Sequence, residues 1–395
     1  YRLHQLARKH AASSLSVEAQ RAGRRRHAAH YLRVLAQCDD RYLQGGDGIF
    51  AALRTLDSEL SNVRAGQEWS ADNEPSIAVG YPDAGVYTLE LRLSPGEKRR
   101  WREAGIRAAQ TLGLVGMEAV HTGNLGLVHI GQGDARGAIA LFERQLELAE
   151  TSGDPRGPVK ALGNLGDAFK QLGDQTKAMA YYSRQVELAE QVGDIHSVGT
   201  ALNNSGLVHA EAGDPTAAIE KYEKAVEIAE MVGDLRLASS ANDNWGIALR
   251  DTGDFRGAIA RHELHLALAR RLGDRRSEGN ALGNLGVACA DLGDTDKTLE
   301  LHEQNLAIAQ EIGDRIGEGN AQTNLSCVVD ELGRADEAIE HARKAIAIAR
   351  EVEHPKAEVD GLLNLGRFTT RQDPVSGIQL LFGARKLAQK IGYRR

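Results

Sequence analysis

The hydrophobic positions between residues 161 and 190 recur with the period of an α-helix. In the first half of this stretch, Leu162, Leu165, Gly166 and Phe169 fall at positions i, i+3, i+4 and i+7. In the second half, one helical face carries the small and apolar residues at positions 178, 181, 182, 186 and 189. The pattern therefore predicts two helices that pack as an antiparallel hairpin.

A Gly-Asp pair separates successive helical segments every 20 residues, from Gly133-Asp134 to Gly313-Asp314. Glycine readily adopts the left-handed conformation that ends a helix, and aspartate accepts hydrogen bonds from the free N–H groups that open the next one. Proline follows the aspartate at Asp154-Pro155, Asp214-Pro215 and Asp373-Pro374. These prolines are expected at the first helical position, where their missing N–H costs nothing.

An asparagine followed by an apolar residue and a small residue returns every 40 residues on the first helix of each pair. The seven asparagines are Asn124, Asn164, Asn204, Asn244, Asn284, Asn324 and Asn364. Each repeat unit of 40 residues therefore contains two helical segments of nearly equal length.

The small residues of the unit resemble the signature of the tetratricopeptide repeat family. Glycine on the first helix, as at Gly126 and Gly166, and alanine on the second, as at Ala138 and Ala178, let the two helices approach closely. The resemblance covers residues 116–395 as seven units, the last of them a cap. The 40-residue unit is similar to the longer-repeat branch that includes LGN/Pins polarity adaptors and kinesin light chains. The resemblance implies an all-α fold, a right-handed superhelical solenoid of antiparallel helix pairs.

Residues 73–115 are interpreted as a degenerate first unit of the same kind. Its second helix ends at Gly113, one period before Gly153, and opens at Ser94-Pro95-Gly96-Glu97, which has the pattern of a capping box. Its first helix is expected around residues 82–93, where the asparagine triplet is missing.

The first 72 residues differ in kind from the repeats. The stretch YRLHQLARKHA, residues 1–11, resembles the end of the winged helix in bacterial NB-ARC or STAND ATPases, and a helical spacer is expected to follow it. His4 matches the family histidine that approaches the nucleotide phosphates, whereas Leu3 and Gln5 depart from the family motif. No GxxxxGK[ST] phosphate loop is present, so an ATPase domain that binds ATP or ADP would lie upstream of Tyr1. No cofactor is expected in this chain.

Composition and charge agree with an all-α protein and exclude several functions. Aromatic residues are only 5% of the 395 residues, which is low for a β-sandwich. The net charge of −7 includes no basic surplus for nucleic acid. The three cysteines are widely separated, which argues against a disulfide framework and fits a reducing cytoplasm. No apolar run is long enough to span a bilayer, so a cytoplasmic location is expected.

Enzyme chemistry is not expected, because no organised catalytic cluster is visible. His262 and His265 lie three residues apart on one helix and could share a metal ion, but no third ligand with matching spacing is seen. His262 and His302 moreover occupy the repeat position of Phe142, Tyr182 and Tyr222, which indicates packing. No metal site is therefore predicted.

The asparagines are the candidate binding residues. In tetratricopeptide arrays the first helices line the concave surface, and the residue before the Leu-Gly pair points into that groove. A carboxamide both donates and accepts hydrogen bonds, which suits a peptide group. The arrangement resembles the asparagine ladders of armadillo proteins and of O-linked N-acetylglucosamine transferase. Further candidates beside the ladder are Asn280, Asn320, Asn203, Asn242 and Asp243. The alternative interpretation is that each asparagine bonds its own or the adjacent helix and sets the repeat spacing.

These observations suggest a peptide- or protein-binding sensor of a STAND-type signal-transduction ATPase, with the ligand in the groove. Such a ligand would shift a closed state of the parent protein toward an open, oligomerising one. The alternative is a constitutive protein–protein adaptor of the LGN type without an ATPase. Both hypotheses expect a protein or peptide partner, and neither expects direct binding to nucleic acid or to a membrane.

Overall fold

The computed structural model describes residues 15–44 and 47–393, so the candidate His4 lies outside the described residues. Every regular element in these ranges is a helix, and no strand occurs among them. The prediction of an all-α fold built from repeated helix pairs is therefore confirmed. The chain divides after Ser197 into two compact units, which we describe separately.

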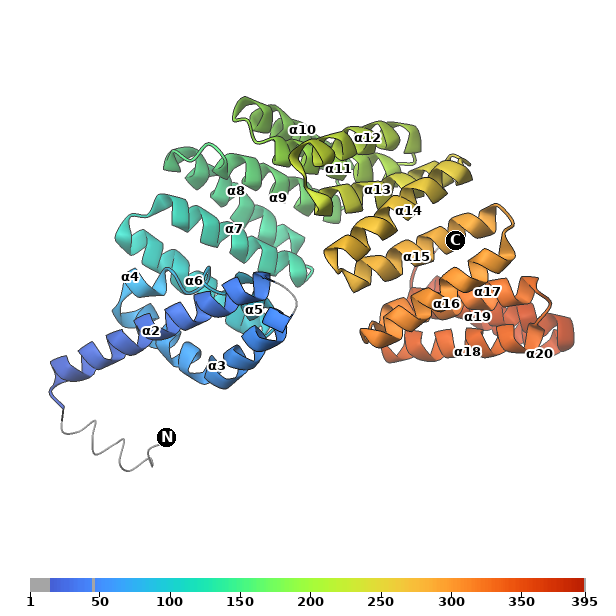
Figure 1. The fold of residues 1–395 in the computed structure, drawn as a ribbon, viewed down its shortest axis with the longest axis horizontal. Helices are drawn as coiled ribbons and strands as arrows, with labels where there is room; N and C mark the ends of the chain where they lie inside the picture. The colour runs from blue at the N-terminus through green and yellow to red at the C-terminus, as the bar shows by residue number, and fades with distance from the viewer. Residues whose placement is uncertain (1–14, 45–46, 394–395) are drawn as a thin grey trace. The chain divides into compact units, whose positions relative to one another are not determined.

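Unit 1 begins with two long helices and continues with the first repeats (Figure 1). Its helices are α2 (Val17–Leu43), α3 (Asp47–Asn73), α4 (Pro75–Ala78), α5 (Val86–Glu90), α6 (Pro95–Leu112), α7 (Val115–Gly131), α8 (Ala135–Ser152), α9 (Gly157–Gln171) and α10 (Gln175–Gln191). The buried Tyr81 joins its N-terminal helices, because its hydroxyl donates a 2.8 Å hydrogen bond to the carbonyl oxygen of Ala28 and its ring meets Trp101 edge to face.

The helix expected around residues 82–93 is much shorter in the structure. Only α5 is helical there, and it follows turns that contain Gly80, Pro82 and Gly85. Gly85 lies so close to α2 that a Cβ would come within 2.5 Å of the Leu35 side chain. The predicted capping box is present, because Ser94 accepts from the Glu97 N–H and the Glu97 carboxylate accepts from the Ser94 N–H.

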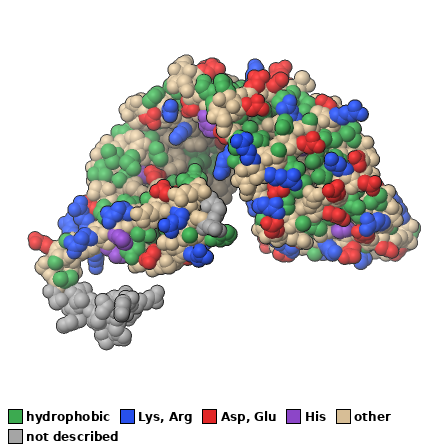
Figure 2. All heavy atoms as spheres, in the orientation of Figure 1, with side chains coloured by type: hydrophobic (Ala, Val, Ile, Leu, Met, Phe, Trp, Pro, Cys, Tyr) green, Lys and Arg blue, Asp and Glu red, His purple; other side chains and the backbone are tan. Residues whose placement is uncertain are grey.

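Unit 2 consists of helix pairs of similar length (Figure 1). Its helices are α11 (Ile195–Glu211), whose first residues precede the division, α12 (Pro215–Val232), α13 (Leu235–Asp251), α14 (Phe255–Leu272), α15 (Arg275–Asp291), α16 (Thr295–Glu311), α17 (Arg315–Glu331), α18 (Ala335–Glu351), α19 (Pro355–Gln372) and α20 (Pro374–Lys390). On the face that Figure 2 shows, acidic and basic side chains are interspersed over this unit.

The Gly-Asp turns have the predicted geometry. Gly253 has a φ of 84°, and the Asp254 carboxylate accepts a 2.9 Å hydrogen bond from the N–H of Gly257. The same cap opens the helices that follow Asp134, Asp174, Asp214, Asp234, Asp274, Asp294 and Asp314. These local bonds confirm the prediction of where one helix ends and the next begins.

One turn differs from the expectation. Pro155 was expected at the first position of a helix, but it lies in a turn, and α9 begins two residues later at Gly157. Asp154 accepts instead from the N–H of Arg156, which holds the chain in the turn. Pro158 takes the place in the first helical turn.

Glycine on the first helix makes room for an aromatic ring on the second. A Cβ at Gly166 would lie 2.4 Å from the Tyr182 ring, closer than any side chain tolerates. The pairs Gly126–Phe142, Gly206–Tyr222, Gly246–His262 and Gly286–His302 repeat this contact. The prediction that His262 and His302 take the packing position of the aromatic residues is confirmed.

No helix of the described ranges is long and apolar enough to cross a membrane.

Candidate functional site

The seven asparagines of the ladder lie at equivalent places on the first helices α7, α9, α11, α13, α15, α17 and α19, and all are half-buried. The additional candidates differ in burial. Asn280 and Asn320 are exposed one turn earlier on α15 and α17, whereas Asn203 is buried. Asn242 is also buried, and its amide donates to the carbonyl oxygen of Ala238 within its own helix, so it does not face a ligand.

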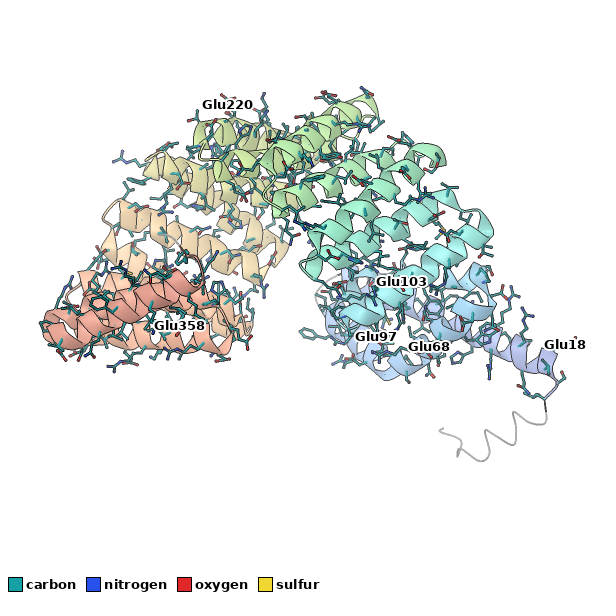
Figure 3. All side chains as sticks on the ribbon, turned by 180° about the vertical axis from the view of Figure 1, so that it is seen from behind. Glu18, Glu68, Glu97, Glu103, Glu220 and Glu358 are labelled. Carbon is teal, nitrogen blue, oxygen red and sulfur yellow. The ribbon has the colours of Figure 1, made fainter. Side chains whose placement is uncertain are left out.

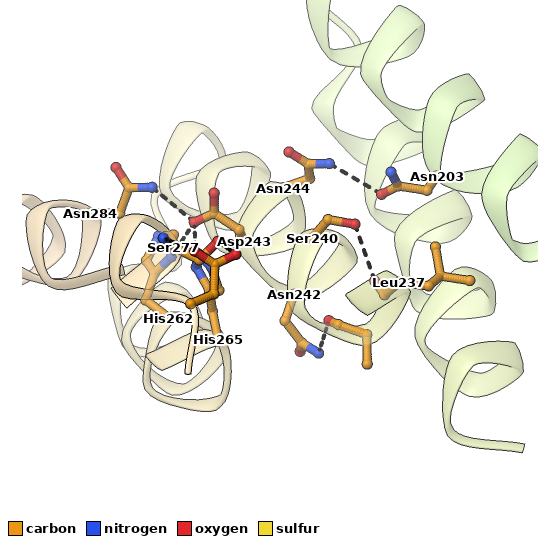
Figure 4. A network of polar contacts seen from close by, with 12 residues as sticks. Asn203, Leu237, Ser240, Asn242, Asp243, Asn244, His262, His265, Ser277 and Asn284 are labelled. Carbon is orange, nitrogen blue, oxygen red and sulfur yellow. Dashed lines mark hydrogen bonds and ion pairs between the residues drawn. The ribbon is translucent and has the colours of Figure 1, made fainter. Parts of the chain in front are cut away.

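Two ladder asparagines of unit 2 bond the preceding repeat (Figure 4). The amide nitrogen of Asn244 donates a 3.1 Å hydrogen bond to Asn203, and that of Asn284 donates a 2.8 Å bond to Asp243. In both cases the acceptor is the residue just before the preceding ladder asparagine. These bonds hold neighbouring first helices together, as the alternative interpretation requires.

Ion pairs join first helices at the same sequence offset. Arg250 on α13 pairs with Asp291 on α15 at 2.6 Å. Arg371 on α19 likewise pairs with the buried Asp330 on α17 at 2.6 Å. These two pairs neutralise charge between neighbouring first helices.

The other ladder asparagines bond different acceptors or none. Asn164 donates to Gln145 at 3.0 Å, and Asn364 donates to the Cys327 sulfur at 3.3 Å. The Asn324 side chain makes no hydrogen bond with any described residue, because Gly283 occupies the position that supplies the acceptor elsewhere. Its whole carboxamide is therefore available to a ligand.

The hydrogen-bonded asparagines also keep polar groups that can bind a ligand. Each uses one amide hydrogen, and the carbonyl oxygens of Asn164, Asn244, Asn284 and Asn364 accept no hydrogen bond from the described residues. None of these oxygens is buried without a partner, so they reach solvent. A second amide hydrogen and the oxygen are the two groups that a peptide bond can pair with.

A cavity of about 610 Å³ in unit 1 lies beside the first ladder residue, Asn124. Exposed apolar side chains line it, among them Tyr87, Leu91 and Leu127. Arg102 borders it and donates to the backbone carbonyl oxygen of Asn124 at 3.0 Å. The sequence interpretation missed this pocket, because Tyr87 and Leu91 come from a segment without the repeat pattern.

A larger cavity of about 780 Å³ lies between α18, α19 and α20 and contains no ladder residue. Arg350 and Glu358, which form a 2.7 Å ion pair, stand at its edge. Figure 3 labels Glu358 on α19.

The two histidines of α14 have a neighbour that sequence spacing did not reveal. Asp243 on α13 places its Oδ1 3.3 Å from Nδ1 of His262 and 3.1 Å from Nδ1 of His265 (Figure 4). The third group lies on α13 and not on α14, so the spacing along one helix could not show it. The packing of the two helices brings it to the histidines. Burial opposes ionisation of Asp243, but the nearby imidazoles of His262 and His265 and the hydrogen bond from the Asn284 amide outweigh it and hold the pKa of the carboxyl well below its usual range.

The repeat geometry agrees with a family model. The model of the tetratricopeptide repeat matches residues 117–191, 197–271 and 277–351, together more than half of the chain. The chain belongs to the tetratricopeptide repeat family. No curated protein sequence matches it significantly.

Solved structures of similar fold align over most of the chain. A signal transduction ATPase with numerous domains (STAND) protein with a tetratricopeptide repeat sensor, from Pyrococcus horikoshii, is 15% identical, with a TM-score of 0.58 over 92% of this chain and 62% of that one. Aspartyl phosphate phosphatase F from Bacillus subtilis is 14% identical, with a TM-score of 0.59 over 92% and 94%. A Rap protein complexed with Competence and Sporulation Factor is 13% identical, with a TM-score of 0.53 over 87% and 98%. At these identities the similarity is one of fold.

Proposed function

We propose that this tetratricopeptide repeat chain binds a polypeptide along its first helices and serves as the sensor of a STAND-type switch protein. The observation that carries the proposal is that the half-buried carboxamides of Asn164, Asn244, Asn284 and Asn364 have oxygens that reach solvent and accept no hydrogen bond from the described residues. An extended peptide presents one donor and one acceptor per residue, which such amides can pair with.

The amides of Asn280, Asn320 and Asn324 are the most informative for a test. Their side chains hold no hydrogen bond to the described residues, so their removal leaves the contacts between repeats intact. We expect the native chain to select peptides from a displayed random library. A variant with Asn280→Ala, Asn320→Ala and Asn324→Ala is expected to bind the selected peptides at least tenfold more weakly and to melt at the native temperature.

Gln304→Ala is the matched control, because Gln304 is an amide on the second helix α16. It should leave peptide affinity unchanged. Equal peptide binding by the native protein and the triple variant would show that the ladder is architectural. In that case, the apolar pocket beside Asn124 becomes the next surface to test.

The sensor assignment is tested separately from peptide binding. The STAND protein of Pyrococcus horikoshii carries a sensor of this fold, and the Rap protein of this fold is in complex with Competence and Sporulation Factor. A phosphate-loop motif in the same reading frame upstream of Tyr1 would support the switch. A complete reading frame without that motif would support the constitutive adaptor, which uses the same peptide-binding face.

A further inference from the structure

We propose that Asp243, His262 and His265 bind one divalent transition-metal ion, with Zn²⁺ as the best fit. The three residues offer a carboxylate oxygen and two imidazole nitrogens that all lie within 4.8 Å of one another. The site adjoins the ladder, because Asp243 accepts a hydrogen bond from Asn284, but metal binding can be measured without a peptide.

The distances between the ligand atoms suit a tetrahedral ion. Zn²⁺ binds imidazole nitrogen and carboxylate oxygen at ~2.0–2.2 Å, so two ligand atoms of a tetrahedral site are about 3.3–3.5 Å apart. Oδ1 of Asp243 lies 3.3 Å and 3.1 Å from the two Nδ1 atoms. The two imidazole nitrogens lie within 4.8 Å of each other, so a side-chain adjustment that brings them to the tetrahedral spacing would complete the geometry.

The Nδ1 atoms of the two histidines are buried and lack a hydrogen-bond partner. His262 and His265 are 1% and 4% exposed, and neither Nδ1 has a hydrogen-bond partner among the described residues, although both are within ion-pair distance of Asp243. A buried polar atom without a hydrogen-bond partner destabilises the folded state. A cation between the three side chains would satisfy both nitrogens at once.

The surroundings of Asp243 also favour a cation. Asn284 on α15 donates to Oδ1 of Asp243 and orients the carboxylate, as outer-shell partners of metal ligands do. The Asp243 side chain is 22% exposed, which leaves solvent access for an ion and for a water as fourth ligand.

The combination is confined to one repeat. The last repeat has Leu363 at the position of Asp243. At the three equivalent positions the other five repeats carry Gly123, Phe142 and Gln145; Gly163, Tyr182 and Gln185; Asn203, Tyr222 and Ala225; Gly283, His302 and Asn305; and Thr323, Ala342 and Ala345. Glycine elsewhere makes room for the amide of the second helix, since a Cβ at Gly163 would lie 2.6 Å from the Gln185 side chain. Packing alone therefore does not require an aspartate and two histidines here.

Substitutions for the three ligands can be taken from the equivalent positions of the other repeats, where these residues already pack between the two helices. Asp243→Asn, His265→Gln and His262→Phe each introduce the residue that stands at the same position in another repeat, namely Asn203, Gln145 and Phe142. His302→Phe is the matched control, because His302 is equally buried but has Gly283 and Asn305 in place of the other two ligands.

The test is a titration of the chelator-treated protein with Zn²⁺ against a chromophoric competitor, followed by the Co²⁺ absorption spectrum. We expect one tightly bound Zn²⁺ per native chain and an intense tetrahedral Co²⁺ spectrum. The His302→Phe variant should match the native protein, whereas each ligand variant should lose at least tenfold in affinity, together with the tetrahedral spectrum. Melting curves without metal check that each variant is folded, and any one folded ligand variant suffices.

Absence of stoichiometric Zn²⁺ binding by the native protein would overturn the proposal. Equal binding by the native protein and the folded ligand variants would also overturn it, since the ion would then be bound elsewhere. A Co²⁺ spectrum of octahedral intensity would exclude the tetrahedral site.

Discussion

The His302 ring on α16 lies against the backbone of Gly286 on α15, so that a Cβ on residue 286 would come within 2.6 Å of the ring. The same contact with a phenylalanine or tyrosine ring occurs in sister repeats. The glycine and the ring are thus one packing unit, and either partner can be tested alone.

Gly286→Ala should destabilise the chain by about 1–3 kcal/mol, because the added methyl group forces the buried ring to move. Gly383→Ala in α20 is the control, since outside the local backbone of α20 and the two neighbouring residues no described atom lies within 4 Å of the position of its Cβ. Alanine there should raise stability by about 0.5–1 kcal/mol through its higher helix propensity. Urea unfolding measures both, and equal effects of the two substitutions would contradict the packing argument.

Acid should weaken the fold through His302. Burial lowers the pKa of His302 to about 4, whereas an unfolded histidine titrates near pH 6.5. The unfolded state then binds the extra proton first, so the stability is complete above pH 6.5 and falls by up to about 3 kcal/mol as the pH drops to 4. His302→Phe should flatten this part of the profile. Free energies of unfolding that fall equally steeply with acid in both proteins would assign the loss to other groups.

Asn244→Ala and Asn324→Ala should separate structural from available amides. The first substitution leaves the buried oxygen of Asn203 without its donor and should cost about 1–3 kcal/mol. The second removes an amide without a described partner and should change stability by less than about 0.5 kcal/mol. Thermal melts of the two variants measured side by side decide the matter, and a larger loss for Asn324→Ala would refute the assignment.

Arg334→Asn should stabilise α18. Arg334 stands where the ten preceding turns have aspartate, and within the described chain its side chain makes no cap bond to the helix. Asparagine offers the missing acceptor without adding charge next to Asp336 and Glu337, and should contribute about 0.5–1 kcal/mol. Asp254→Ala, which removes a cap that is present, should lose a similar amount. Chemical denaturation measures both, and a loss on Arg334→Asn would show that its ion pair with Glu337 matters more.

The fold was largely predictable from the sequence because its signals are local and repeated. A helix end needs only a local pair such as Gly253 and Asp254, and nine of the ten Gly-Asp pairs are followed directly by a helix. The prediction was wrong at the short α5, where the repeat pattern fades, and at Pro155. There the boundaries depend on packing against α2 and on a competing turn bond of Asp154.

For the candidate site, the sequence predicted where the asparagines lie but not which of them are hydrogen-bonded. The sequence by itself placed the ladder asparagines on equivalent faces, since the 40-residue period fixes their register. Which amides are engaged depends on the residue across the interface, an acceptor at Asp243 and none at Gly283, and only the tertiary structure shows that pairing. The cluster of Asp243, His262 and His265 arose in the same way, because close packing of α13 on α14 brings together side chains that the chain separates.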